Sequence, residues 1–141
     1  MTPELPLAAR WKGEHRVLDD LFGEFLMALE KGDAEATRLA IEEFDALLRH
    51  HTQREEEQLF APSETRRLAP LEGETDEARI FRELRLEHVQ VREVSGMILH
   101  LLSEGPDLEG ARRLAPNLAR RWDAHTAREE KELSRLMSDL T

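Results

Sequence analysis

Two segments of the sequence place a histidine and a glutamate four residues apart. Residues 51–56 read HTQREE, and residues 125–130 read HTAREE. A helix turns by roughly 100° per residue, so in each copy the two side chains project from one face about a turn apart. Imidazole nitrogens and carboxylate oxygens suit iron, manganese, zinc or cobalt, and each segment therefore predicts half of a metal site.

The repeat extends well beyond these two motifs. His15 recurs as His88 at an offset of 73 residues, and Gly32 recurs at the same offset as Gly105. The extra Pro106 then shifts the offset to 74, which is the spacing of the two motifs. The chain therefore reads as a duplicated helix pair, in which each unit carries a histidine, a turn and then His-x-x-x-Glu.

Six residues are candidate metal ligands, and all of them occupy the apolar stripe of their helix. They are His15, His51, Glu55, His88, His125 and Glu129. Burying such a polar group without a partner costs about 1–3 kcal/mol, and more for a charge. The alternative is four ordinary core histidines and two buried ion pairs. Six such residues in a pseudo-twofold arrangement favour a metal site, because buried charges are either paired or metal-bound.

The donor count predicts a binuclear centre. Four imidazoles can give two nitrogens to each of two ions, and the two carboxylates can bridge the ions. With one bridging oxo, hydroxo or water oxygen, each ion has five donors and one octahedral position stays open. An open position favours small-molecule chemistry over a purely structural metal.

Helices are expected to position these residues, because apolar residues recur in steps of three and four and no strand pattern occurs. The expected helices are roughly 8–31, 34–61, 76–104 and 108–139, with a longer connection at 62–75. Short turns make neighbours antiparallel, so the predicted fold class is all-α, an up-down-up-down four-helix bundle in one domain, 1–141. Pro116 predicts a kink or a delayed start in the fourth helix, after a turn near 108–114.

Composition excludes several kinds of partner and site. The chain of 141 residues has 20 basic and 30 acidic residues, and its net charge of −10 argues against nucleic acid and anionic membranes as partners. It has no cysteine, which excludes thiolate ligands, iron–sulfur clusters and disulfides. The start lacks an export signal and no apolar run is long enough to span a membrane, so a cytoplasmic location is expected.

With these motifs identified, the chain resembles hemerythrin-like, or HHE cation-binding, proteins over about residues 11–136. The resemblance rests on Glu14-His15, His51-x-x-x-Glu55-Glu56 with Leu59-Phe60, Glu87-His88, and His125-x-x-x-Glu129-Glu130. Ferritin-like di-iron bundles use Glu-x-x-His instead, and no histidine here has a glutamate three residues before it. The resemblance therefore implies the hemerythrin-like bundle.

One position departs from the oxygen-carrying members of that family. They have a fifth histidine one turn after the third-helix ligand, where this chain has Arg92. The set of four histidines and two glutamates is instead similar to the di-iron domain of repair-of-iron-centres proteins. Those proteins often carry a cysteine-containing N-terminal domain as well, and this sequence contains no cysteine.

The resemblance implies two iron ions, oxo- or hydroxo-bridged, although zinc or manganese would suit the same donors. The expected function is to bind or sense O2, NO or a peroxide in a stress response, as a metal- and gas-binding protein rather than a turnover enzyme. The alternatives are an iron-handling or repair-of-iron-centres-like stress enzyme, and a structural or storage binder of zinc or another divalent cation.

Other residues near the stripes carry weaker expectations. Asp19 and Arg92 occupy equivalent positions in the two halves, and we expect them either to pair or bond to ligand carboxylates near the metals, or to be solvated. His50 and His100 lie off the ligand stripe and are not expected to be ligands.

Two further pairs of residues flank the candidate ligands. Trp11 and Trp122 either wall the pocket or only pack in the core. Glu14 and Glu87 either relay protons and guide ions, or are solvated.

Overall fold

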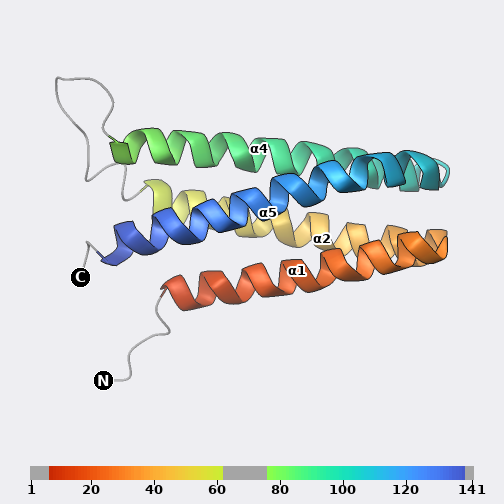
Figure 1. Cartoon of the computed structure of the whole chain (residues 1–141), viewed down its shortest axis with the longest axis horizontal. Helices are drawn as coiled ribbons and strands as arrows, with labels where there is room; N and C mark the ends of the chain where they lie inside the picture. The colour runs from red at the N-terminus through yellow and green to blue at the C-terminus, as the bar shows by residue number, and fades with distance from the viewer. Residues whose placement is uncertain (1–6, 62–75, 139–141) are drawn as a thin grey trace.

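Four helices packed side by side make up the structure, a computed structural model that describes residues 7–61 and 76–138 (Figure 1). The helices are α1 (Leu7–Lys31), α2 (Ala34–Glu55), α4 (Asp76–Ser103) and α5 (Leu108–Ser138), and the short π-helical segment η1 (Glu56–Phe60) continues α2. The described residues contain no strand. The predicted all-α four-helix bundle is therefore confirmed.

The α1–α2 and α4–α5 turns lie at the same end of the bundle, on the right in Figure 1, and they are built alike. Gly32 (φ +74°) and Gly105 (φ +129°) adopt positive φ, a conformation that costs glycine little because it has no Cβ. Asp33 and Asp107 follow, and each side chain accepts a hydrogen bond from the backbone N–H three residues later. These caps satisfy N–H groups that the first helical turn leaves without partners.

Two apolar clusters fill the bundle, with a layer of polar residues between them. The larger cluster lies toward the turns and contains Leu18, Phe22, Phe25, Phe44, Leu48, Val91, Ile98, Leu118 and Trp122, among others. The smaller cluster contains Phe60, Ile80, Phe81, Leu84 and Leu133. Along α4 and α5, the candidate ligands fall between the residues of the first cluster and those of the second. Apolar packing on both sides therefore fixes the helices that carry the site.

Three local expectations, for the fourth helix, the second helix and the connection between the halves, have different outcomes. Helix α5 begins at Leu108 and runs through Pro116, so the delayed start is wrong. Proline removes one helical hydrogen bond there, and the surrounding helix continues because its apolar face packs along the core. The expected second helix, 34–61, changes to π-helical geometry at Glu56. The expected connection, 62–75, lies outside the described residues.

One further property follows from the helices. No helix in the described ranges, 7–61 and 76–138, is long and apolar enough to cross a membrane.

Candidate metal centre

All six predicted ligands meet inside the bundle, and none has more than 5% of its surface exposed. They form two groups that share both glutamates. The first group contains His15, His51, Glu55 and Glu129, and the second contains Glu55, His88, His125 and Glu129. Within each group, one donor atom per residue lies within 4.8 Å of the others. The helices thus gather two overlapping sets of donors, each large enough to hold a metal ion.

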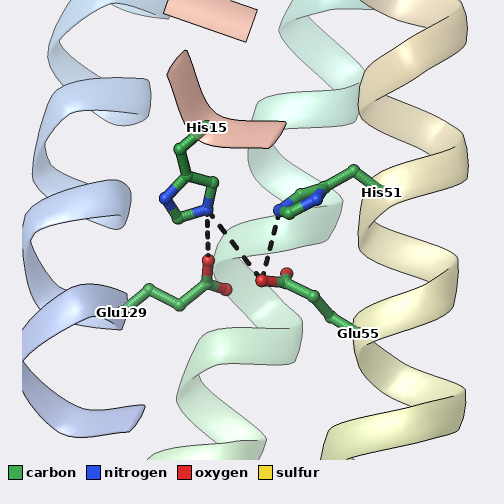
Figure 2. Close-up of side chains that lie close together, drawn as sticks. All are labelled: His15, His51, Glu55 and Glu129. Carbon is green, nitrogen blue, oxygen red and sulfur yellow. Dashed lines mark hydrogen bonds and ion pairs between the residues drawn. The ribbon is translucent and has the colours of Figure 1, made fainter. Parts of the chain in front are cut away.

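In the first group, the Nε2 atoms of both histidines face the carboxylates (Figure 2). Nε2 of His15 lies 2.9 Å from Oε1 of Glu129 and 3.9 Å from Oε2 of Glu55. Nε2 of His51 lies 3.2 Å from the same Oε2 of Glu55. These residues come from α1, α2 and α5, so the group exists only when three helices pack together.

In the second group, the same two carboxylates present their other oxygens. Nε2 of His88 lies 3.0 Å from Oε1 of Glu55 and 3.0 Å from Oε2 of Glu129. Nε2 of His125 lies 3.0 Å from Oε2 of Glu129. Each glutamate therefore directs one oxygen toward each histidine pair, which is the arrangement that two carboxylates need to bridge two ions.

Carboxylates also hold the outer nitrogens of the histidines, in the same way in both halves. Nδ1 of His51 donates to Glu14 at 2.6 Å, and Nδ1 of His125 donates to Glu87 at 2.8 Å. The second oxygen of each glutamate accepts from the arginine three residues after that histidine, Arg54 or Arg128. These bonds place the proton on Nδ1 and leave the Nε2 lone pair for a metal.

His88 has a third carboxylate of this kind. Its Nδ1 donates to Glu56 at 2.8 Å, and Arg85 donates to the other oxygen of Glu56 at 3.2 Å. Glu56 is the first residue of η1, the π-helical segment, and such segments are frequent at functional sites. No role was expected for Glu56. Glu14 and Glu87 were expected either to relay protons and guide ions or to be solvated, and not to hold the ligand histidines.

A signal for two of these contacts was present in the repeat. Each half has a glutamate immediately before its first histidine and an arginine three residues after its second. Because both residues recur, the repeat predicts that the glutamate and the arginine make the same contact in each half. Glu56 also recurs, as Glu130, but the recurrence alone does not identify the histidine that Glu56 contacts.

Aromatic residues close the cluster from two sides. Phe60 stacks on His88, with ring centroids 5.5 Å apart and planes 12° apart. Trp122 meets His15 edge to face at 5.7 Å, and its indole N–H donates to Asp19 at 2.7 Å. Trp122 therefore both packs in the core and walls the cluster. The side chain of Trp11 lies outside the described residues.

Of the two alternatives expected for Arg92 and Asp19, contact with each other or with the ligand carboxylates is not found, and exposure to solvent holds for Asp19 only. Arg92 donates to the hydroxyl of Thr52 at 3.1 Å and lies 3.7 Å from Glu56, whereas Asp19 holds Trp122. Neither bonds to the other or to the ligand carboxylates. His50 and His100 are both exposed to solvent.

The buried glutamates of the cluster are stabilised by positive charge on the neighbouring histidines, and the pKa values of both kinds of residue are shifted accordingly. Burial alone would lower the pKa of His88, but hydrogen bonds with Glu129, Glu55 and Glu56 raise it to about 11. Burial likewise opposes the charge of His125, while the charge of Glu129 raises its pKa to about 9. Burial would raise the pKa of Glu129, yet His125 and the other histidines hold it well below its usual range.

These pKa shifts show that the buried carboxylate of Glu129 requires positive charge, which a bound metal could also provide. Buried carboxylates are stable only beside cations, and here protonated imidazoles supply that charge. Metal ions bound to the four Nε2 atoms would supply it equally well. Six residues with nitrogen and oxygen donors and no sulfur suit iron, manganese or zinc. The residues therefore fit a pair of metal ions by charge, donor type and arrangement.

Glu87→Gln tests the hydrogen bond to the outer nitrogen of His125. The amide keeps the size of the side chain but loses the charge that orients the imidazole and Arg128. We expect metal affinity to fall by about 10–100-fold. Glu83→Gln is the matched control, because Glu83 also bonds to Arg128 but touches no histidine among its described contacts. Equal affinities for the Glu87 variant and the wild type, from competition with a chelator, would show that this bond does not matter.

Comparison with known proteins gives one result. The sequence model of a family described as the hemerythrin HHE cation binding domain matches residues 7–137. Neither the comparison with curated proteins nor that with solved structures gives a match.

Proposed function

The chain belongs to the hemerythrin HHE cation-binding family, and from that premise we propose that it binds two iron ions at a non-haem centre that takes up O2, NO or a peroxide. The proposed ligands are His15, His51, Glu55, His88, His125 and Glu129. The proposal rests mainly on one observation: Glu55 and Glu129 each direct one carboxylate oxygen toward each of the two histidine pairs.

Iron bound in this way supplies redox chemistry and an open coordination position. The chain's own residues supply the surroundings of that position. Glu14, Glu56 and Glu87 hold the outer protons of three histidines, so that their Nε2 lone pairs point inward. Arg92, at the position of the fifth histidine of oxygen carriers, has no lone pair to give a metal.

The surroundings favour a small ligand. A cavity of about 210 Å³ between α4 and α5 is lined by His125 together with Glu87, Gln90, Arg121 and Arg128. This volume suits a diatomic molecule or a peroxide better than a larger substrate, because pockets for drug-sized ligands are usually about 300–1,000 Å³. Trp122 and Phe60 cover other sides of the cluster with apolar surface.

A zinc site is the second candidate, because the same six nitrogen and oxygen donors also suit zinc. In that case the centre would hold the bundle together or store the ion. An iron-handling or stress-defence role differs from the first candidate in requiring turnover at the same centre. The ligand geometry is common to all three.

Metal content and optical spectra distinguish these functions. We expect protein expressed in iron-supplemented medium to contain about two irons per chain, as the two donor groups predict. Its charge-transfer bands should change on anaerobic reduction and again on addition of NO. One zinc per chain with a featureless spectrum would contradict the iron proposal and favour the structural role. Catalytic consumption of NO or peroxide with an added reductant would select the enzyme.

A further inference from the structure

A groove between α2 and α4 lies outside the metal cluster. It consists of two cavities, of about 480 Å³ and 430 Å³, and Arg49 and Arg92 line both of them. The first cavity is also lined by Gln53, Glu56, Glu57, Ala61 and Arg85, and the second by Glu93, Gly96, Met97, His100 and Leu101. We call these two cavities the α2–α4 groove. Two guanidinium groups therefore stand at its middle, with a polar end and a more apolar end.

Contacts with neighbouring residues hold the side chain of Arg49 in place. Its Nε donates to Asp45 at 2.9 Å. Asp45 is only 6% exposed, and it also accepts a hydrogen bond from Ser95 at 2.8 Å. Gly96 leaves room for the guanidinium, since a Cβ there would lie 3.1 Å from Nη2 of Arg49. A buried carboxylate and a glycine together fix the position of this arginine before any ligand arrives.

Both arginines keep donors for a ligand. In the part of the chain that the structure describes, Arg49 bonds only through Nε, so its two Nη groups face no acceptor. Arg92 uses Nη1 for Thr52, with Glu56 3.7 Å from the same nitrogen, and keeps Nη2. The carboxylates that share the polar end have other donors: Glu56 accepts from His88 and Arg85, and Glu57 accepts from Gln53.

The internal repeat provides a comparison for this groove. At the offsets of the duplication, Arg49 corresponds to Asp123 and Arg92 corresponds to Asp19. The equivalent face, between α5 and α1, therefore has two carboxylates where this groove has two guanidinium groups. The duplicated bundle does not need arginine at these positions, because the other half folds with the opposite charge.

We propose that the α2–α4 groove binds a small organic oxyanion, with its carboxylate or phosphate group between Arg49 and Arg92. Guanidinium groups bind both kinds of anion through paired, charge-assisted hydrogen bonds. The apolar part of the molecule lies along Met97 and Leu101, which line the other end. The anion would be bound by groove residues that are not predicted metal ligands, so this proposal does not depend on the metal proposed for the cluster.

Calorimetric titration of the purified protein with phenyl phosphate, benzoate and inorganic phosphate tests this site and separates the two kinds of anion. We expect phenyl phosphate or benzoate to bind more tightly than inorganic phosphate. Arg49→Gln and Arg92→Gln should each weaken binding roughly tenfold or more. Arg38→Gln is the matched control, since Arg38 lies on the same helix and bonds to Glu35 and Glu42 away from the groove.

Several results would reject the site. They are no binding of any probe, unchanged affinity in both groove variants, equal loss in Arg38→Gln, or inorganic phosphate binding as tightly as phenyl phosphate. The side chain of Arg49 is about half exposed, so its variant should fold, and its melting temperature checks this. Metal content is measured on the same preparations. A chain without metal would contradict the proposed function and leave the anion result to stand alone.

Discussion

Glu129→Ala is expected to remove at least one of the two metal ions bound per chain. Oε1 of Glu129 faces His15, while Oε2 faces both His88 and His125, so its loss removes one donor from each group. The side chain is fully buried, and water cannot easily take its place in the same geometry. Breaking a buried charge pair by removing one partner costs about 3–5 kcal/mol, because the other charge is left uncompensated. Metal analysis and urea denaturation measure the two effects.

Glu132→Ala is the matched control for this substitution. Glu132 lies on the same helix, one turn further on, and its partly buried side chain bonds to Arg135 rather than to a predicted ligand. It should keep the wild-type metal content and lose at most about 1 kcal/mol of stability. Glu55→Ala should resemble Glu129→Ala, because its two oxygens also face both histidine pairs, and it should lose at least one metal. Two metals per chain in both glutamate variants would refute the bridging assignment.

Helical periodicity was enough to predict which residues meet at the centre. A side chain on the apolar stripe of each helix must point into the bundle, and repeated polar residues on four such stripes must meet each other. The exact rotation of neighbouring helices does not affect that conclusion. The six candidates are therefore close together because they occupy matching positions on the apolar stripes, and those positions can be read from the sequence.

Contacts at the edges of the stripes could not be predicted in this way. Arg92 and Asp19 lie one turn beyond their histidines, where a small rotation of the helix decides whether a long side chain reaches inward or sideways. Arg92 turns to Thr52 on α2, and Asp19 takes the indole N–H of Trp122. These partners lie on other helices, 40 and 103 residues away in the chain, and no local pattern connects them.

The role of Glu56 depends on backbone geometry that the pattern of the second helix does not reveal. The duplicated motif has a glutamate at the same place in both halves, Glu56 and Glu130. The first copy changes to π-helical geometry at this residue, whereas α5 continues as α-helix. A change in winding rotates the side chains that follow it, and the residues after Glu56 therefore do not repeat the arrangement of those after Glu130.

The same protonated histidines that balance the cluster make the metal-free protein sensitive to pH. His88 and His125 have pKa values of about 11 and about 9 in the fold, above the ordinary value of 6.5. A raised pKa contributes stability that is fully present below pH 6.5 and is lost as the pH rises through the folded values. Metal binding has the opposite dependence, because each Nε2 must lose its proton before it binds a metal.

Chelation is therefore expected to lower the melting temperature by an amount that grows from pH 6 to pH 9. At free metal about 1,000-fold above the dissociation constant, one site contributes about 4 kcal/mol, which at this chain length is about 10 °C. Thermal unfolding with and without a chelator measures this difference at each pH. A difference that shrinks as the pH rises would contradict the exchange of protons for metal. In that case the stable form of these six residues would be the metal-free cluster with protonated histidines, and not the metal-bound form.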